Sequence, residues 1–171
     1  MEIIQKAIEI INSKYDNQIF TSGGCGVLTT VLADICEEQN IKYEITLLLK
    51  HFTEIEKDFN GELSEPFVLT NLSHVFLSAN NQTWDVGGIN AEERWVDYIL
   101  DDEIARFGEE RSDFQCIYID SKTKPLKTLV KITSEYKLST PVFPLYKDMR
   151  QFLVENNVLS KSKESAMTYN N

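Results

Sequence analysis

The sequence of 171 residues predicts a single α+β domain over residues 1–159, followed by a disordered polar tail over residues 160–171. Three observations support this fold class. Apolar residues recur at helical spacing near both ends of the chain, and β-branched and aliphatic runs fill its centre. Hydrophobic residues make up 42% of the chain, enough for one core. No internal repeat, linker or low-complexity segment divides it.

Two helices are expected before the first strand. Isoleucines at helical spacing predict an amphipathic helix over residues 2–14, and the polar residues 15–21 predict a loop. A second helix is expected over about residues 25–39, with Asn40 ending it. Its buried stripe comprises Leu28, Val31, Leu32, Ile35 and Cys36.

The rest of the chain mixes strands and helices. Strands are expected over residues 42–50, 67–69, 73–79, 83–86 and 115–120. Helices are expected over residues 90–100, 101–107 and 145–158, and the pattern of residues 126–136 fits either type. The acidic residues 53–65, with an Asn60-Gly61 turn signal, indicate an excursion over the surface.

Composition excludes several function classes. The net charge is −10, with 27 acidic against 17 basic residues, which argues against nucleic acid or an anionic membrane as partner. Three cysteines are an odd number, and no secretory signal opens the chain, so we expect free thiols in a reducing cytoplasm. No CxxC spacing joins the cysteines, and we therefore expect no metal and no cofactor.

The most informative segment is the glycine-rich stretch TSGGCG at residues 21–26, which leads into an apolar run. It predicts that Cys25 lies in the first turn of a buried helix, where unpaired N–H groups and the helix dipole favour the thiolate. The thiolate is the nucleophilic form of cysteine. The alternative is a glycine-flanked turn whose cysteine only packs.

A nucleophilic cysteine needs a base, and the chain has two histidines, His51 and His74. A hairpin turn at Asn80-Asn81 would pair residues so that His74 and Asp85 become diagonal neighbours on one face. The opposite face is then uniformly apolar, which fixes the register. An ordinary polar pair on an edge hairpin is the alternative. His51 is the competing base, but its acidic surroundings favour a solvated surface residue.

Other candidate residues are assigned from their position. The Cys25 backbone N–H and a side-chain amide from Gln18 or Asn17 are candidates for an oxyanion hole. Three glycines are candidates for lining a substrate groove, although a plain turn is the alternative reading: Gly24, Gly87 and Gly88. Four residues are expected to pack in the core: Cys36, Cys116, Trp84 and Trp95.

The order of Gly23-Gly24-Cys25, His74-Val75 and Asp85-Val86-Gly87-Gly88 resembles the papain-like cysteine peptidase and transglutaminase-like superfamily, particularly small bacterial and phage members. The resemblance covers roughly residues 15–90. It implies a fold in which the nucleophile helix packs against an antiparallel sheet, with further helices toward the C-terminus. It also implies Cys25 as nucleophile, His74 as general base and acid, and Asp85 as orienting residue. The cysteine-glycine-serine-cysteine-tryptophan run of papain is absent here.

These patterns predict a thiol enzyme that attacks a protein, a peptide or a small amide through an acyl-cysteine intermediate, without separating hydrolysis from transfer. The rival interpretation is a non-catalytic acidic protein that blocks a basic partner, as a phage-encoded inhibitor would. Its support is the net charge and the acidic cluster of Asp97, Asp101, Asp102 and Glu103. Cys25→Ala separates the two, because it abolishes only an enzyme's effect. The sequence predicts no oligomeric state.

Overall fold

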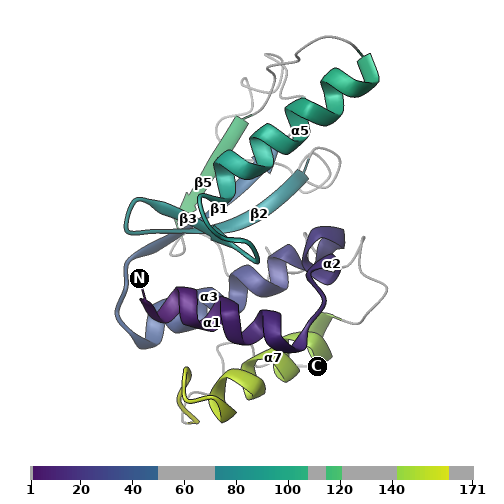
Figure 1. Ribbon diagram of the computed structural model, residues 1–171. Helices are drawn as coiled ribbons and strands as arrows, with labels where there is room; N and C mark the ends of the chain where they lie inside the picture. Colours follow the sequence, from purple (N-terminus) through teal and green to yellow (C-terminus); the bar gives the residue numbers. More distant parts are fainter. Residues whose placement is uncertain (1, 50–71, 108–114, 121–141, 162–171) are drawn as a thin grey trace, which may run out of the picture.

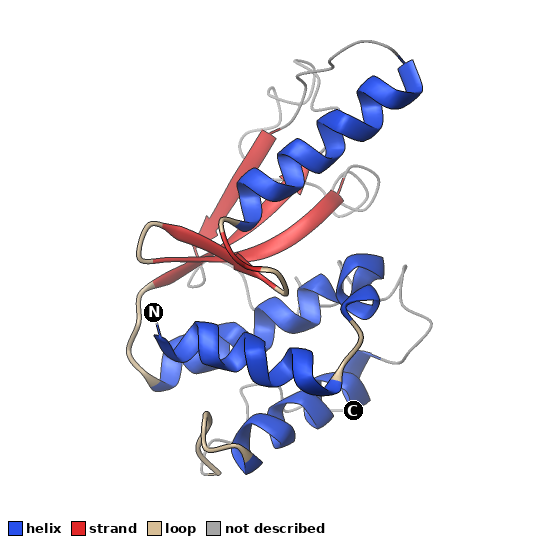
Figure 2. Ribbon diagram, viewed as in Figure 1, coloured by secondary structure: helices blue, strands red, loops and turns tan. Residues whose placement is uncertain are grey.

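The fold contains a five-stranded antiparallel sheet with helices packed on it (Figures 1 and 2). The computed structural model describes residues 2–49, 72–107, 115–120 and 142–161. Its helical elements are α1 (Glu2–Lys14), α2 (Asn17–Ile19), the π-helical segment η1 (Phe20–Gly24), α3 (Cys25–Glu38), α5 (Ala91–Phe107) and α7 (Val142–Glu155). Its strands are β1 (Tyr43–Leu49), β2 (Leu72–Ala79), β3 (Gln82–Asp85), β4 (Gly88–Ile89) and β5 (Gln115–Asp120). The α+β class is therefore confirmed.

The main core lies between one face of the sheet and the helices α1, α3 and α7, which gather on one side of it in Figure 1. The predicted apolar stripe of α3 is buried there, with Leu28, Ile35 and Cys36 at most 1% exposed. Helix α3 ends at Glu38, and Asn40, the residue expected to end it, follows with a left-handed φ of 54°. The N–H of Ile41 then donates to the carbonyl of Cys36 at 2.8 Å, which caps the helix.

The segment before Cys25 differs from the predicted loop. Helical backbone begins at Asn17 and continues through η1 into α3, with Asp16 capping the start through its side chain. Residues 15–21 are mostly polar and show no helical spacing of apolar residues, so the sequence predicts a loop. Tertiary packing overrides this local preference, because Phe20 is fully buried in the main core. Gly23 absorbs the change of helix type with a φ of 112°.

The hairpin register agrees with the prediction. Strands β2 and β3 pair so that Leu77 faces Trp84 and Ala79 faces Gln82. Asn80 and Asn81 have φ of 54° and 59°, the two positive values that a tight two-residue turn needs. The predicted apolar face of the hairpin is buried in the main core: Val75, Leu77, Ala79, Trp84 and Val86. The polar face therefore turns toward the other side of the sheet.

That other side is covered by α5, which packs Ala91, Trp95 and Val96 against Leu48 and Phe76 (Figures 1 and 2). The sequence predicted two helices over residues 90–107, but α5 is continuous, because no glycine or proline interrupts it. Strand β4 was not predicted, and α7 begins three residues earlier than expected. Four predicted features lie outside the described residues: the segments 53–65, 67–69 and 126–136 and most of the tail.

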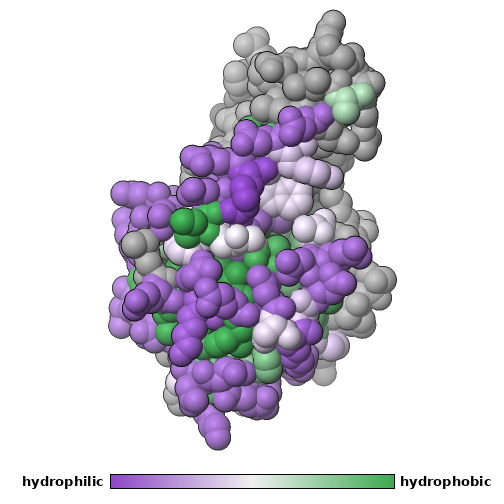
Figure 3. Space-filling model, viewed as in Figure 1, coloured by the Kyte–Doolittle hydropathy of each residue, from purple (hydrophilic) through white to green (hydrophobic). Residues whose placement is uncertain are grey.

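The surface in Figure 3 is mainly hydrophilic on the face shown, with apolar patches in its middle. Within the described parts of the chain, no helix has the length and apolar character needed to span a bilayer.

Candidate active site

Cys25 is the first residue of α3 and is 7% exposed. Because helical backbone precedes it, the cysteine does not lie at a free helix N-terminus, which corrects one part of the prediction. The sulfur still has nearby backbone donors. The backbone N–H groups of Gly26 and Val75 favour the thiolate and act to lower the pKa of the Cys25 thiol.

The donor from Val75 has a clear origin in the sheet. Strand β3 pairs with β2 only as far as Leu77, so the next backbone groups of β2 that point to this edge are those of Val75. Helix α3 occupies the vacated edge. The Thr29 hydroxyl donates to the Val75 carbonyl at 3.3 Å, and the Val75 N–H acts to lower the pKa of the Cys25 thiol. Cys25 and Thr29, one helical turn apart on α3, thus contact the part of the β2 edge that β3 leaves unpaired.

His74 lies on β2 and is 2% exposed. Its Nε2 is 3.2 Å from Asp85 Oδ2, which confirms the predicted diagonal contact between the two residues. The contact lacks the alignment of a full hydrogen bond, so its attraction is mainly electrostatic. The imidazole also interacts with the Cys25 thiol, and this interaction raises the pKa of His74. His74 therefore lies between the thiol and the carboxylate.

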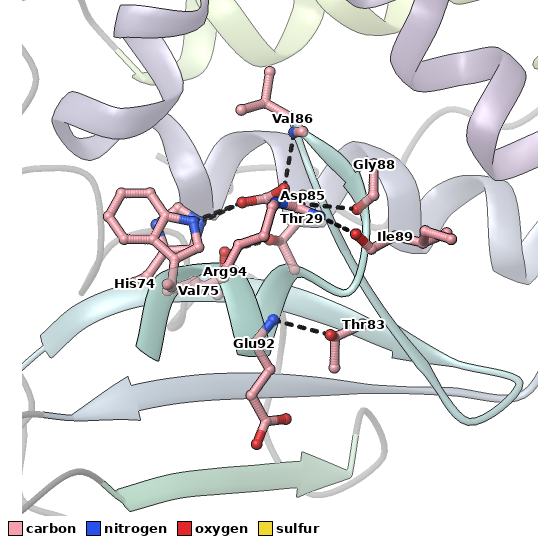
Figure 4. Close-up of polar contacts among 12 residues, drawn as sticks. Thr29, His74, Val75, Thr83, Asp85, Val86, Gly88, Ile89, Glu92 and Arg94 are labelled. Atoms are coloured by element: carbon pink, nitrogen blue, oxygen red, sulfur yellow. Dashed lines mark hydrogen bonds and ion pairs between the residues drawn. The ribbon is translucent and has the colours of Figure 1, made fainter. Parts of the chain in front are cut away.

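Asp85 ends β3 and is 4% exposed, yet its carboxylate has several donors (Figure 4). Oδ1 accepts from the Gly87 N–H at 2.8 Å and from Arg94 Nη2 at 2.5 Å. Oδ2 accepts from Trp95 Nε1 at 2.7 Å and faces His74. A buried charge with this many partners is held in one orientation.

Trp95 was predicted to be a core residue, and the structure places it against the site. Its ring stacks on the His74 imidazole with centroids 4.0 Å apart and planes at 22°. The same side chain donates to Asp85. Trp84, by contrast, is in the core as expected, 2% exposed. Sequence reasoning missed Trp95 because its contact depends on how α5 docks on the sheet, which no local pattern encodes.

The three groups shift one another's protonation. Burial acts to raise the pKa of the Cys25 thiol, but His74 together with the N–H groups of Val75 and Gly26 outweighs it and holds that pKa below its ordinary value. Burial acts to lower the pKa of His74, but contacts with Asp85 and Cys25 outweigh it and raise that pKa. Burial likewise opposes ionisation of Asp85, but the contacts with His74, with Trp95 and with the Gly87 N–H together outweigh it and lower the carboxyl pKa. These directions favour a thiolate–imidazolium pair beside an ionised carboxylate.

The predicted oxyanion and groove residues lie in several places. Gln18 and Asn17 are exposed in α2. The backbone of Gln18 donates to the Asp16 carboxylate and accepts from the Thr21 hydroxyl. Gly24 is buried, and a Cβ there would lie 2.6 Å from the Ile19 carbonyl oxygen, so this glycine allows a close backbone approach. The oxyanion role of the Gln18 amide and the groove role of Gly24 stay predictions.

Gly87 and Gly88 follow Asp85 in the turn between β3 and β4. Gly88 has a φ of 93°, in the left-handed region that favours glycine, and a Cβ on Gly87 would lie 2.8 Å from Arg94 Nη2. The backbone of the turn therefore favours glycine at position 88, and Gly87 leaves room for the Arg94 guanidinium. The groove role of both glycines stays a prediction.

The remaining thiols and histidine fall outside this cluster. Cys36 is fully buried in the core, where burial raises its pKa to about 12. Cys116 lies on β5 opposite Leu48, with its side chain outside the described features. The competing base His51 lies outside the described residues. Among the residues described, no three histidine, cysteine or carboxylate side chains converge as metal ligands.

A pocket of about 780 Å³ opens at the far end of the hairpin. Its lining includes Glu44, Asn81, Gln82 and Glu92, and none of the three predicted catalytic residues. Phe76, fully buried on the same face of β2, lies between His74 and Ser78, which lines this pocket. The pocket and the Cys25–His74–Asp85 cluster are therefore separate features.

Comparisons with known proteins add no relative: no family model, curated protein or solved structure matches this chain. The interpretation of the site therefore rests on the geometry and chemistry of its own residues.

Proposed function

We propose that this protein is a thiol-dependent acyl-transfer enzyme with Cys25 as nucleophile, His74 as general base and acid, and Asp85 as orienting carboxylate. The observation that carries the proposal is the position of His74, which contacts the Cys25 thiol and lies 3.2 Å from Asp85 Oδ2. A helix-borne thiol, a strand-borne imidazole and a carboxylate on the next strand are consistent with a papain-like arrangement.

In the first half of the reaction, the Cys25 thiolate attacks the carbonyl carbon of an amide. The carbonyl π electrons move to oxygen, and a tetrahedral intermediate forms. When the intermediate collapses, the C–N bond breaks and the His74 imidazolium gives its proton to the departing nitrogen. The products are a free amine, a thioester on Cys25 and a neutral imidazole. Asp85 stabilises the imidazolium before this step.

In the second half, a water molecule or an acceptor amine attacks the thioester while neutral His74 removes its proton. The C–S bond breaks and the sulfur leaves as thiolate, so that the imidazolium–thiolate pair is restored. Water yields a carboxylic acid, and an amine yields a new amide. The substrate class we propose is a peptide or another simple amide.

The proposal is tested by trapping the acyl-enzyme. The full chain is mixed with p-nitrophenyl acetate, quenched in acid and digested, and acetylation of each cysteine is followed by mass spectrometry. We expect acetyl-Cys25 to form at pH 6, and no acetyl-Cys25 to form above background in a His74→Gln variant. Cys36, which is buried without a base, is the internal control. Acetylation of Cys25 at the same rate in both proteins would overturn the proposal.

A non-catalytic acidic binding protein is the second candidate. The net charge of −10 favours it, as does the 7% exposure of the thiol, which restricts substrate access. Acyl-enzyme formation at Cys25 would exclude this candidate, because a blocking surface needs no reactive thiol.

A further inference from the structure

Arg94 is a cation that contacts the orienting carboxylate from the solvent side. It lies in the first turns of α5, its side chain is 41% exposed, and its Nη2 is 2.5 Å from Asp85 Oδ1. The same guanidinium donates to the carbonyls of Gly88 and Ile89 in the turn that follows Asp85 (Figure 4). The two carboxylate oxygens are thus divided, with Arg94 at Oδ1 and His74 at Oδ2.

The turn has the shape that this contact requires. A Cβ on Gly87 would lie 2.8 Å from Arg94 Nη2, so any larger residue at this position would displace the guanidinium. The Gly87 N–H also donates to Oδ1, the same oxygen that Arg94 contacts. A glycine in the chain and a cation on the helix therefore converge on one carboxylate oxygen.

We propose that Arg94 is a positioning residue that shares the Asp85 carboxylate with His74 and thereby limits how firmly that carboxylate holds the protonated imidazole. The positive charge of Arg94 repels the imidazolium and offsets part of the field that the carboxylate exerts on it. Arg94 therefore favours release of the His74 proton, the step that protonates the leaving amine. The role of Arg94 in catalysis rests on the proposed function, but its effect on the protonation of His74 does not.

The charged groups that contact the His74–Asp85 pair come from three elements. Cys25 approaches from α3, Asp85 itself belongs to β3, and Arg94 approaches from α5. Strand β1 places the apolar Leu48 opposite His74. From α1, the uncharged Asn12 donates to the Val86 carbonyl at 2.9 Å. Of these charged groups, Arg94 is the one that can be replaced by a neutral residue while the thiol, the imidazole and the carboxylate all stay in place.

The test is an NMR titration of the histidine ring carbons in the full chain, which has only two histidines, His51 and His74. In Arg94→Gln we expect the pH midpoint of the His74 titration to rise by about one unit, a tenfold change in proton affinity. In Arg94→Lys, which keeps the charge, we expect most of that rise to disappear. Gly87→Ala, which displaces the guanidinium, should raise the midpoint in the same direction as Arg94→Gln.

Lys6→Gln is the matched control, because it removes the same charge from an exposed position on α1 and should leave His74 unchanged. His51 serves as the internal reference. An unchanged His74 midpoint in Arg94→Gln, or an equal change in the glutamine and lysine variants, would overturn the inference. These outcomes are separate from failure of the proposed function, which is the absence of acetyl-Cys25 in the wild-type chain.

Discussion

The two ends of α3 each carry a buried cysteine, and the two thiols are in opposite chemical states. Cys36 is fully buried among apolar side chains, and burial raises its pKa to about 12. Cys25 is 7% exposed, yet His74 and two backbone N–H groups together outweigh the effect of burial and lower the pKa of its thiol. The comparison shows that burial alone raises the pKa of a thiol and keeps it protonated. Burial beside an imidazole that a carboxylate holds instead lowers the pKa and favours the thiolate.

Removing the imidazole should make Cys25 resemble Cys36, and this is the largest effect we expect. In His74→Gln the burial of the Cys25 thiol is opposed only by the N–H groups of Gly26 and Val75, so its thiolate fraction falls. We expect the rate constant for alkylation of Cys25 by iodoacetamide at pH 6 to fall about a hundredfold. Peptide mass spectrometry measures the rate for each cysteine, and slow alkylation of Cys36 in both proteins shows that the fold is intact. An unchanged rate at Cys25 would contradict the comparison.

A serine at each cysteine position of α3 tests whether the surroundings of Cys36 are apolar and those of Cys25 are polar. Cys36→Ser places a hydroxyl at a fully buried position, and we expect it to lower the free energy of unfolding by about 2 kcal/mol. Cys25→Ser should cost less than about 1 kcal/mol, because two backbone N–H groups and His74 already surround the sulfur. Urea denaturation measures both. Cys36→Ala, expected to cost about 1 kcal/mol, controls for lost volume. Equal costs for the two serine variants would break the comparison.

Removing the charge of Asp85 should weaken the activation of Cys25 without abolishing it. In Asp85→Asn the pKa of His74 falls, so the imidazolium that stabilises the thiolate is lost at a lower pH. We expect alkylation of Cys25 at pH 7 to slow about tenfold.

The same variant has a pH-dependent effect on stability. The lowered pKa of Asp85 stabilises the fold above the ordinary carboxyl pKa, and this contribution is lost as the pH falls through the lowered value. The raised pKa of His74 stabilises the fold below the ordinary histidine pKa, and this contribution is lost as the pH rises through the raised value. Wild type and Asp85→Asn should therefore differ most in unfolding free energy between about pH 4 and pH 6.5. A difference independent of pH would argue against the ion pair.

The sequence predicted the activated end of α3 better than it predicted the reason for the activation. Alternation of apolar residues fixed the hairpin register, and with it the contact between His74 and Asp85. The helical start before Cys25 was missed, because polar residues concealed a segment that is anchored by a buried Phe20. Trp95 and Arg94 were missed as site residues because α5 reaches Asp85 only after it packs on the sheet. Local patterns encode neighbours along the chain, whereas the surroundings of the carboxylate depend on tertiary docking.

The smallest effect we expect concerns the strand edge that α3 replaces. Thr29 is 2% exposed, and its hydroxyl donates to the carbonyl of Val75, whose N–H contacts the Cys25 sulfur. Thr29→Val keeps the shape but removes this donor, which frees the Val75 peptide to shift. We expect alkylation of Cys25 to slow about threefold and unfolding free energy to fall by about 1 kcal/mol. Thr30→Val is the matched control, because that hydroxyl is equally buried but bonds within α3, to the Gly26 carbonyl at 2.8 Å. If both variants slowed alkylation equally, the Val75 edge would have no specific part in holding the thiolate, and His74 alone would distinguish Cys25 from Cys36.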